Sequence, residues 1–279
     1  MIISIASGKG GTGKTTLAIN LALSLEKNVQ YLDCDVEEPN GHIFVKPTFD
    51  EKKSFGMPIP VVDFDKCDYC GKCGEICEYN AIVVIKQNVL VFPDLCHSCA
   101  GCWLVCPQKA ISTKDKEVGQ LELGNRNGIE FIHGKLNVGE SLSPPLIRAV
   151  KEKMDPTKTV IIDSPPGTSC PVIEAIKESD FVVLVTEPTP FGFNDLKLAV
   201  EMVRKIGLNF GVIINRADVG NRDVHDYCTR ENIPILMEIN NDRKIAEAYS
   251  RGVPIVELYP EYRDKFLALY QDIERRVGA

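Results

Sequence analysis

Long apolar runs are missing from this sequence, and so is an excess of positive charge. No run approaches the about 20 consecutive apolar residues that a transmembrane helix needs, and the N-terminus leads directly into a glycine-rich loop without a secretory signal. The 32 lysines and arginines are outnumbered by 39 aspartates and glutamates, which gives a net charge of −7. A non-specific nucleic-acid binder would need surplus cations to displace phosphate counterions. We therefore expect a cytoplasmic protein with no nucleic-acid partner and no stable membrane insertion.

Cysteine is scarce outside one short stretch. Of the 11 cysteines, eight lie between Cys67 and Cys106, and only Cys34, Cys170 and Cys228 lie elsewhere. A secreted disulfide scaffold would be a short chain with cysteines throughout its length. A tight cluster within 279 residues of ordinary composition, 44% hydrophobic and 25% charged, indicates metal ligation instead.

Short apolar runs alternate with amphipathic stretches of helix length along most of the chain. The runs cover residues 1–6, 29–32, 159–162, 181–186 and 210–214. Continuous apolar strands separated by helices are typical of a parallel sheet that is covered on both faces. The pattern predicts an α/β fold with a mostly parallel, doubly wound sheet.

The cysteine stretch interrupts this alternation and repeats itself with an offset of 29 residues. The first copy contains Cys67, Cys70, Cys73, Cys77, Ala81 and Ile82, and the second contains Cys96, Cys99, Cys102, Cys106, Ala110 and Ile111. We predict a small α+β module at residues 58–115, inserted into an α/β domain made of residues 1–57 and 116–279.

Residues 8–15 fit the phosphate-loop pattern G-x-x-x-x-G-K-[ST] between a predicted strand and a predicted helix. Glycines let backbone N–H groups converge on phosphate oxygens, and the helix N-terminus adds its partial positive charge. Lys14 is expected to reach the β- and γ-phosphates, and the Thr15 hydroxyl to ligate Mg²⁺. The expected nucleotide-binding residues of the loop are Gly8, Lys9, Gly10, Gly11, Thr12, Gly13, Lys14, Thr15 and Thr16.

The K-G-G-T-G-K-T form of the loop resembles the deviant Walker A loop of the MinD/ParA class of P-loop ATPases. This class includes the nitrogenase iron protein and the Mrp/Nbp-type iron–sulfur carriers, and the resemblance covers residues 1–47 and 118–279. It implies ATP hydrolysis by an ATP-dependent homodimer in which Lys9 crosses the interface to the partner's nucleotide. The alternative for Lys9 is a solvated loop lysine.

Two further stretches resemble the switches of this class. Residues 32–35, Leu-Asp-Cys-Asp, match switch I, which implies that Asp35 orients the attacking water and contributes to the Mg²⁺ site, with Asp33 supporting it. Residues 160–167 match Walker B and switch II, which implies that Asp163 holds Mg²⁺ through water and that Gly167 senses the γ-phosphate. The resemblance thus assigns catalysis to Lys9, Lys14 and Asp35. The alternative for Asp163 is a helix cap.

Two positions outside these motifs are also candidates. Asn215 and Arg216 lie where the class places a base-reading asparagine, so both are expected to bind the nucleotide. Cys170 lies seven residues after Asp163, which resembles the offset of a bridging-cluster ligand in the nitrogenase iron protein. Cys170 is therefore a candidate interfacial thiol, because a two-fold axis brings a residue close to its own copy. The alternative is a small thiol packed under the switch.

The pattern C-x2-C-x2-C-x3-C occurs twice and resembles bacterial two-cluster ferredoxins, in which the fourth cysteine of each run ligates the other run's cluster. The resemblance implies one [4Fe–4S] cluster on Cys67, Cys70, Cys73 and Cys106, and a second on Cys77, Cys96, Cys99 and Cys102. Zinc is the alternative, but it takes four ligands from pairs of cysteines and fits two interleaved runs of four poorly.

The leading hypothesis is a homodimeric ATPase that couples its nucleotide state to electron transfer through two [4Fe–4S] clusters, with ATP and Mg²⁺ as further cofactors. A module inserted after switch I would move as that loop responds to ATP. One alternative is an ATP-dependent iron–sulfur assembly or carrier protein, although the C-terminal half lacks the C-P-x-C pair of that group. Another is a non-enzymatic redox-sensing regulatory or positioning module. The partner is expected to be a redox or iron–sulfur client protein.

Overall fold

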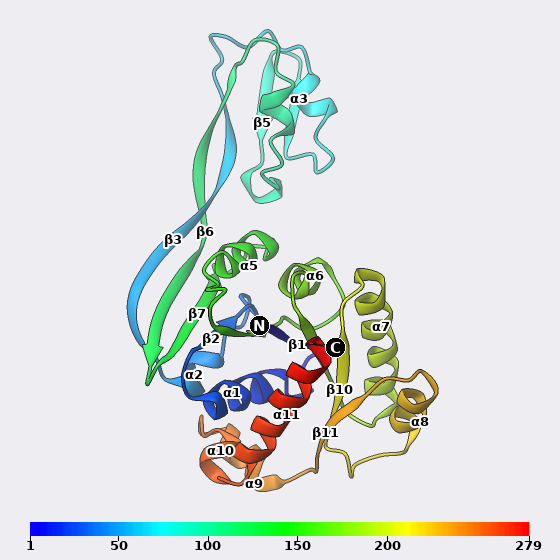
Figure 1. The fold of residues 1–279 in the computed structure, drawn as a ribbon. Coiled ribbons are helices and arrows are strands. Elements are labelled where there is room, and N and C mark those ends of the chain that lie inside the picture. The colour runs from blue at the N-terminus through cyan, green and yellow to red at the C-terminus, as the bar shows by residue number, and fades with distance from the viewer. Residues whose placement is uncertain (279) are drawn as a thin grey trace. The chain divides into compact units, whose positions relative to one another are not determined.

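Two units make up the chain in a computed structural model that describes residues 1–278 (Figure 1). The first unit comprises Met1–Lys52, Leu121–Lys135 and the residues from Ser143 onwards, and the second comprises Lys53–Gln120 and Leu136–Leu142. The module predicted at residues 58–115 falls inside the second unit. Each unit has a hydrophobic core of its own.

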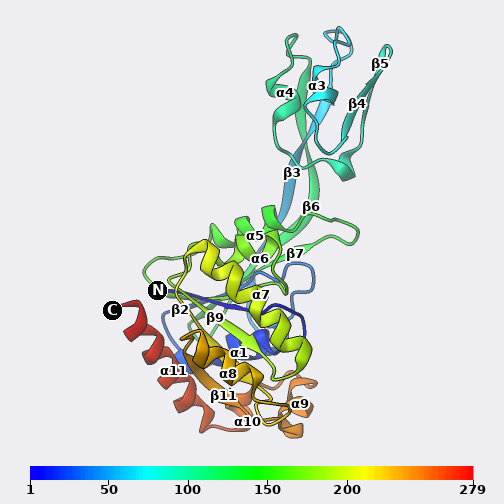
Figure 2. The same ribbon diagram turned by 90° about the vertical axis from the view of Figure 1, so that its right-hand side faces the viewer.

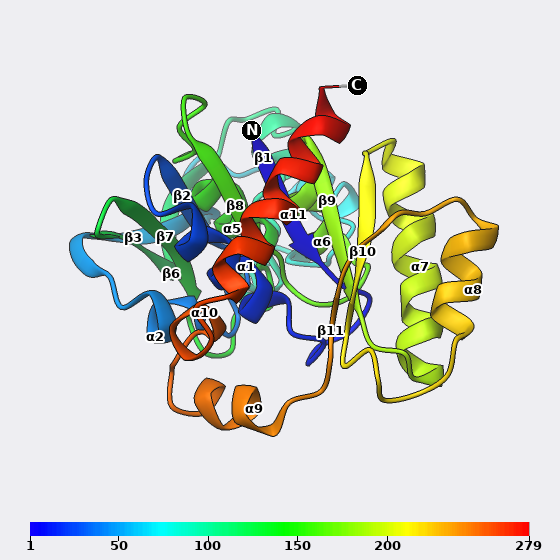
Figure 3. The ribbon, with the colours of Figure 1, turned by 60° about the horizontal axis from the view of Figure 1, so that its bottom comes forward.

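Nine strands form the main sheet in the order β11-β10-β9-β1-β8-β2-β7-β6-β3 (Figure 3). Their bounds are β1 Ile2–Ala6, β2 Val29–Asp33, β3 Thr48–Val62, β6 Ile111–Arg126, β7 Ile129–Leu136, β8 Thr159–Asp163, β9 Phe181–Thr186, β10 Phe210–Asn215 and β11 Ile235–Ile239. Every neighbouring pair from β11 to β7 in this order is parallel. The expected α/β fold with a mostly parallel sheet is confirmed.

Helices cover both faces of this sheet, with α1 and α11 on one face and α5 and α6 on the other (Figures 1 and 3). The helices of the first unit are α1 Lys14–Leu25, α2 Gly41–Val45, α5 Pro144–Lys151, α6 Cys170–Ile176, α7 Pro190–Ile206, α8 Asp223–Arg230, α9 Arg243–Tyr249, α10 Ile255–Leu258 and α11 Tyr262–Val277. Within residues 1–278, no helix has both the length and the apolar character needed to cross a membrane.

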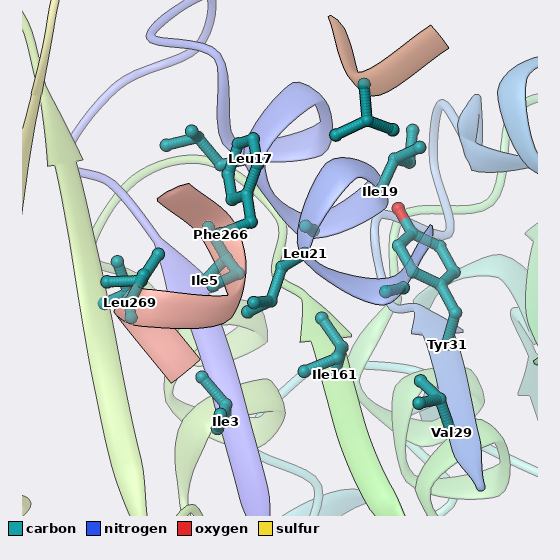
Figure 4. Close-up of a cluster of buried hydrophobic side chains, with 14 of the residues drawn as sticks. Ile3, Ile5, Leu17, Ile19, Leu21, Val29, Tyr31, Ile161, Phe266 and Leu269 are labelled. Atoms are coloured by element: carbon teal, nitrogen blue, oxygen red, sulfur yellow. The ribbon is translucent and has the colours of Figure 1, made fainter. Parts of the chain in front are cut away.

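The core under α1 and α11 fixes the helix that begins the phosphate site. Leu17 and Leu21 of α1 pack with Phe266 of α11 on Ile3 and Ile5 of β1 (Figure 4). All five side chains are buried, and full burial of one such side chain contributes about 1.5–3 kcal/mol. The central strand and α1 are therefore held tightly on either side of the loop that joins them.

The register of the central strands brings three functional segments to one edge of the sheet. Asp163 at the end of β8 is the register partner of Ile5 in β1 and of Asp33 in β2. In open α/β sheets, ligands bind outside the carboxyl ends of the strands. The loops that follow β1, β2 and β8 converge there.

A tight hairpin joins β6 to β7. Its two residues, Asn127 and Gly128, have φ angles of 51° and 91°, as a type I′ turn requires. The strands β3 and β6 are the longest within residues 1–278, with 15 and 16 residues. Each begins in one of the two units and ends in the other.

The second unit contains a small antiparallel hairpin and three short helices (Figure 2). Its elements are α3 Lys72–Glu75, β4 Ile82–Ile85, β5 Asn88–Val91, the 3-10 helix Pro93–Leu95 and α4 Gly101–Leu104. The core is small: Ile82, Val89 and Cys102 are buried, and Trp103 packs partly buried against them.

Candidate functional site

The phosphate loop lies between the end of β1 and Lys14, the first residue of α1. Gly13 has a φ of 97°, in the left-handed region that glycine adopts without steric cost. A Cβ at Gly13 would lie 2.6 Å from Nδ2 of Asn215, and a Cβ at Gly8 would lie 2.2 Å from the carbonyl oxygen of Asp195. Both positions therefore require glycine, because neighbouring groups press against the loop.

A cleft of about 370 Å³ opens beside this loop. Its lining includes the expected residues Gly10, Gly11, Gly13, Lys14, Thr15, Thr16, Asp35, Asn215 and Arg216. Gly8, Lys9 and Thr12 do not line it. Burial lowers the pKa of the Lys14 ammonium, while Asp163 and Asp35 act in the opposite direction. The cleft thus presents a largely desolvated cation at the N-terminus of a helix, where an anionic phosphate binds favourably.

Asp163 does not line this cleft, but it lies buried beside two residues that do, Lys14 and Thr15. Its Oδ2 accepts a hydrogen bond from the Tyr31 hydroxyl at 3.1 Å, whereas its buried Oδ1 has no hydrogen-bond partner among residues 1–278. Burial raises the pKa of Asp163 to about 6, opposed by Thr15 and Lys14. A buried carboxylate oxygen beside a threonine hydroxyl fits the oxygen-rich coordination that Mg²⁺ prefers. These residues therefore fit the expected magnesium site.

Asp33 accepts hydrogen bonds from the backbone of the loop that follows β2, the stretch that resembles switch I. Its Oδ2 accepts hydrogen bonds from the N–H groups of Asn40 at 3.1 Å and Gly41 at 2.9 Å, and its Oδ1 accepts one from Asp35 at 3.2 Å. Burial and the nearby Asp163 raise the pKa of Asp33. Asp35 lines the cleft itself, and burial with the charge of Asp163 raises its pKa to about 6. The two aspartates therefore differ in position: one anchors backbone, and the other faces the nucleotide cleft.

Lys9 contacts a buried carboxylate that the sequence motifs do not reveal. Its Nζ lies 3.8 Å from Oε2 of Glu187, and Nη1 of Arg216 lies 3.1 Å from Oε1 of the same residue. The Glu187 side chain is 8% exposed and that of Lys9 is 31% exposed. Within one chain, Lys9 is therefore paired with Glu187 and does not reach the cleft. The only sequence signal is a glutamate directly after the apolar run of β9.

Asn215 braces the phosphate loop. Its Nδ2 donates to the carbonyl oxygen of Thr12 at 2.9 Å, and its Oδ1 accepts from the N–H of Arg216 at 3.0 Å. The far side of the cleft is formed by residues that the sequence analysis missed. They are Asn240, Asn241, Asp242, Ile245, Ala246, Tyr249 and Ile255. An Asn-Asn-Asp sequence directly after the last strand was the available signal.

The cysteines of the second unit surround two small hollows of about 20 Å³ each. The first is lined by Cys67, Cys70, Cys73 and Cys106, and the second by Cys77, Cys96, Cys99 and Cys102. Each hollow thus combines three cysteines of one run with the last cysteine of the other. Within residues 1–278, no three Cys, His, Asp or Glu side chains converge on a point that would hold a single metal ion. Four thiols around one hollow fit a cluster, because its ligands bind separate irons.

The sequence repeat is also a repeat of backbone geometry. Gly71 before α3 and Ala100 before α4 are both left-handed, with φ of 84° and 70°. The N–H of Ala81 donates to Sγ of Cys77 at 3.2 Å, and the N–H of Ala110 donates to Sγ of Cys106 at 3.3 Å. Both of these crossing cysteines therefore receive the same backbone hydrogen bond, which favours a thiolate sulfur.

Comparison with known proteins agrees with this geometry. Residues 3–255 match the family described as the CobQ/CobB/MinD/ParA nucleotide binding domain. The chain belongs to this family. An uncharacterized protein from Methanocaldococcus jannaschii is 34% identical over 79% of this chain and 80% of its own length. An iron-sulfur cluster carrier protein from Pyrococcus furiosus is 26% identical over 91% of this chain and 78% of its own length.

Among solved structures, the septum site-determining protein MinD from Pyrococcus horikoshii OT3, complexed with Mg-ADP, aligns with a TM-score of 0.58. The alignment covers 99% of this chain and 97% of that protein at 22% identity, so it supports the fold alone. The chain is a P-loop ATPase of the MinD/ParA class.

Two expected residues of this ATPase lie beyond switch I. Gly167 has a φ of 101°, and its N–H donates to the carbonyl oxygen of Ser7 at 3.0 Å, so switch II is tied to the start of the phosphate loop. Cys170 is exposed at the first residue of α6 and does not line the nucleotide cleft. Its role as an interfacial thiol stays a prediction.

Proposed function

We propose that this ATPase couples its nucleotide state to electron transfer through two [4Fe–4S] clusters held in a ferredoxin-like module at residues 58–115. The observation that carries the proposal is the sorting of the eight cysteines into two hollows, each with the four residues expected for one cluster. Apolar side chains line most of each hollow beside the cysteines, and such a hydrophobic surrounding would influence the redox potential of a bound cluster. The module follows switch I in the chain and is separated from it by α2 and the first part of β3.

In the nucleotide cleft, Lys14 and the N–H groups of the phosphate loop bind the β- and γ-phosphates. Thr15 and Asp163 hold Mg²⁺, the latter through water, and Asp35 positions the attacking water in line with the γ-phosphate. Phosphoryl transfer depends on such positioning and charge stabilisation, since the protein has little covalent chemistry to perform. Lys9 completes the site in an ATP-dependent homodimer by reaching the partner's nucleotide, which requires it to leave Glu187.

In the module, Cys67, Cys70, Cys73 and Cys106 hold the first cluster, and Cys77, Cys96, Cys99 and Cys102 hold the second. When bound, such clusters accept and release single electrons, at potentials set by hydrogen bonds and burial around the sulfurs. The N–H groups of Ala81 and Ala110 stabilise the negative charge on the two crossing sulfurs. The bound clusters would take single electrons from a reduced electron-donor protein and pass them to an oxidised redox client protein.

An iron–sulfur carrier function is the second candidate. It is favoured by relatives named iron-sulfur cluster carrier protein, which are 26% identical in Pyrococcus furiosus and in Aquifex aeolicus. In that case a whole cluster, and not an electron, passes to the client.

Electron paramagnetic resonance of anaerobically purified, dithionite-reduced protein tests these functions. Electron coupling predicts two interacting cluster signals that change with Mg-ATP but not with Mg-ADP, and no ATP effect in Lys14→Ala. Transfer of iron and sulfide to an apo-ferredoxin, with loss of the signals from this protein, would establish the carrier function instead. Cluster signals that do not change on adding Mg-ATP, in protein that hydrolyses ATP, would contradict the coupling.

A further inference from the structure

The short helix α2 is held at its N-terminal end by the switch I aspartate. Asp33 accepts hydrogen bonds from the N–H groups of Asn40 and Gly41, the first residues of this helical turn. A Cβ at Gly41 would lie 2.7 Å from a ring carbon of Tyr31 and 3.0 Å from Oδ2 of Asp33. The helix therefore begins in close contact with the groups that also position Asp163, the expected magnesium ligand.

The C-terminal end of α2 is held by a different strand. Arg126, the last residue of β6, donates from Nη1 to the carbonyl oxygens of Phe44 at 3.0 Å and Val45 at 2.8 Å, the last residues of α2. Its Nη2 also lies 3.4 Å from Oε1 of Glu257. Hydrogen bonds at both ends therefore clamp α2 between β2 and β6, and the guanidinium at its C-terminus also stabilises the helix dipole.

A third set of contacts reaches α2 from its side. The ring of His42 in α2 lies 5.4 Å from that of His133 in β7, and Phe49 of β3 stacks on His133 at 5.3 Å. Nε2 of the buried His133 lies 2.7 Å from Oε2 of Glu122 in β6. Oε1 of Glu122 pairs with Lys52 of β3 at 2.6 Å. Both long strands are thus in contact with the helix or with its immediate neighbour.

The opposite ends of the same two strands border the cysteines. Val62, the last residue of β3, and Ile111, the first residue of β6, both line the first hollow. Pro60 of β3 also lines the second hollow, whereas no residue of β6 does, so β6 borders the first hollow alone. In sequence, Val62 precedes Cys67 by five residues, and Ile111 follows Cys106 by five.

We propose that α2 is a coupling element between the nucleotide cleft and the first cysteine hollow, with Arg126 as the positioning residue that joins it to β6. Nucleotide-dependent movement of switch I displaces Asn40 and Gly41, and the clamp passes this displacement to β6 and β3. The inference rests on the proposed function and deepens it, because it assigns the ATP response to the cluster on Cys67, Cys70, Cys73 and Cys106. Coupling is reciprocal, so the redox state must change the ATP affinity by the same factor.

The test compares the Kd for Mg-ATP of oxidised and dithionite-reduced protein in wild type and in Arg126→Gln. Allosteric factors are commonly about 5- to 150-fold, and we expect the wild-type ratio of the two Kd values to fall to within about twofold of unity in Arg126→Gln. Hydrogen exchange gives a second readout: Mg-ATP should change exchange along residues 113–125 of β6 in wild type and not in the variant.

Arg204→Gln is the matched control, because Arg204 also donates to a backbone carbonyl at a helix end, that of Glu231 at 3.1 Å. It should keep the wild-type ratio. If Arg126→Gln does not fold, two milder variants replace it. Arg126→Lys keeps the positive charge but loses the planar guanidinium, and Glu122→Gln removes a charge beside His133. Each of them should reduce the ratio of the two Kd values in part.

A wild-type ratio that survives in Arg126→Gln overturns the inference and leaves the proposed function standing. Equal loss of affinity in both redox states of the variant, with the ratio unchanged, shows a merely structural role and also overturns it. A wild-type ratio of one, with unchanged spectra on adding ATP, refutes the proposed coupling itself.

Discussion

The pairing of Lys9 with Glu187 predicts that Glu187 opposes ATP-driven dimerisation. In the homodimer proposed above, Lys9 has to leave this carboxylate before it reaches the partner's nucleotide, so the intramolecular ion pair would compete with the dimer. Glu187→Gln removes the charge and retains the shape of the side chain. We expect this variant to dimerise more readily in the presence of ATP.

The geometry sets the size of the effect. At the 3.8 Å that separates Nζ of Lys9 from Oε2 of Glu187, two unit charges attract by about 4 kcal/mol at an effective dielectric constant of about 20. Lys9 is 31% exposed, and Arg216 shares the carboxylate, so screening reduces the net value to about 1 kcal/mol. One kcal/mol is about fivefold, and a dimer breaks two such pairs, so the dimerisation constant should rise about 25-fold.

Sedimentation with Mg-ATP measures this constant directly, in an Asp35→Ala background that slows hydrolysis. Glu201→Gln removes a charge from an exposed position on α7 and should leave the constant unchanged. With Mg-ADP, all variants should stay monomeric. An unchanged or smaller constant in Glu187→Gln would refute the competition, and dimerisation that survives Lys9→Ala would show that Lys9 does not cross the interface.

Three further outcomes follow from the structure. Lys14→Ala should abolish ATP binding in calorimetry, whereas Asp35→Ala should bind ATP and hold the dimer; hydrolysis at the wild-type rate in Asp35→Ala would show that the switch I assignment is wrong. Cys106→Ser should lower the iron content from about eight to about four per chain and remove the signal of the first cluster, and loss of the second instead would contradict the crossed ligation. Burial lowers the pKa of His133 below its ordinary value; Glu122 opposes this shift, and His42 and Lys135 add to it. The unfolded state therefore binds more protons than the folded state, and the stability of the fold falls as the pH drops below about 6.5. The difference in melting temperature between pH 7.5 and pH 5.5 should shrink in His133→Gln, and an unchanged difference would show that His133 does not titrate in this range.

The fold and the phosphate loop could be predicted because their signals are local. A strand such as β9 is buried along its whole length, so residues 181–185 appear in the sequence as an unbroken apolar run. Glycine is required at positions 8 and 13 because a Cβ there would collide with Asp195 and Asn215, and the loop pattern contains both glycines. The repeat of 29 residues likewise places Gly71 and Ala100 in the same backbone conformation before two equivalent short helices.

Glu187 and Arg126 could not be predicted, because neither belongs to a motif and each acquires its role from contacts far along the chain. Glu187 meets Lys9 only because β9 lies beside β1 in the sheet. Arg126 reaches the end of α2 only because the hairpin after it returns the chain to pair β7 with β2. A charged residue at the end of a strand has no local signature that separates a solvated side chain from one that clamps a switch. The long-range order of the strands therefore decides which polar residues regulate the site, and that order is what the one-dimensional pattern of apolar runs leaves open.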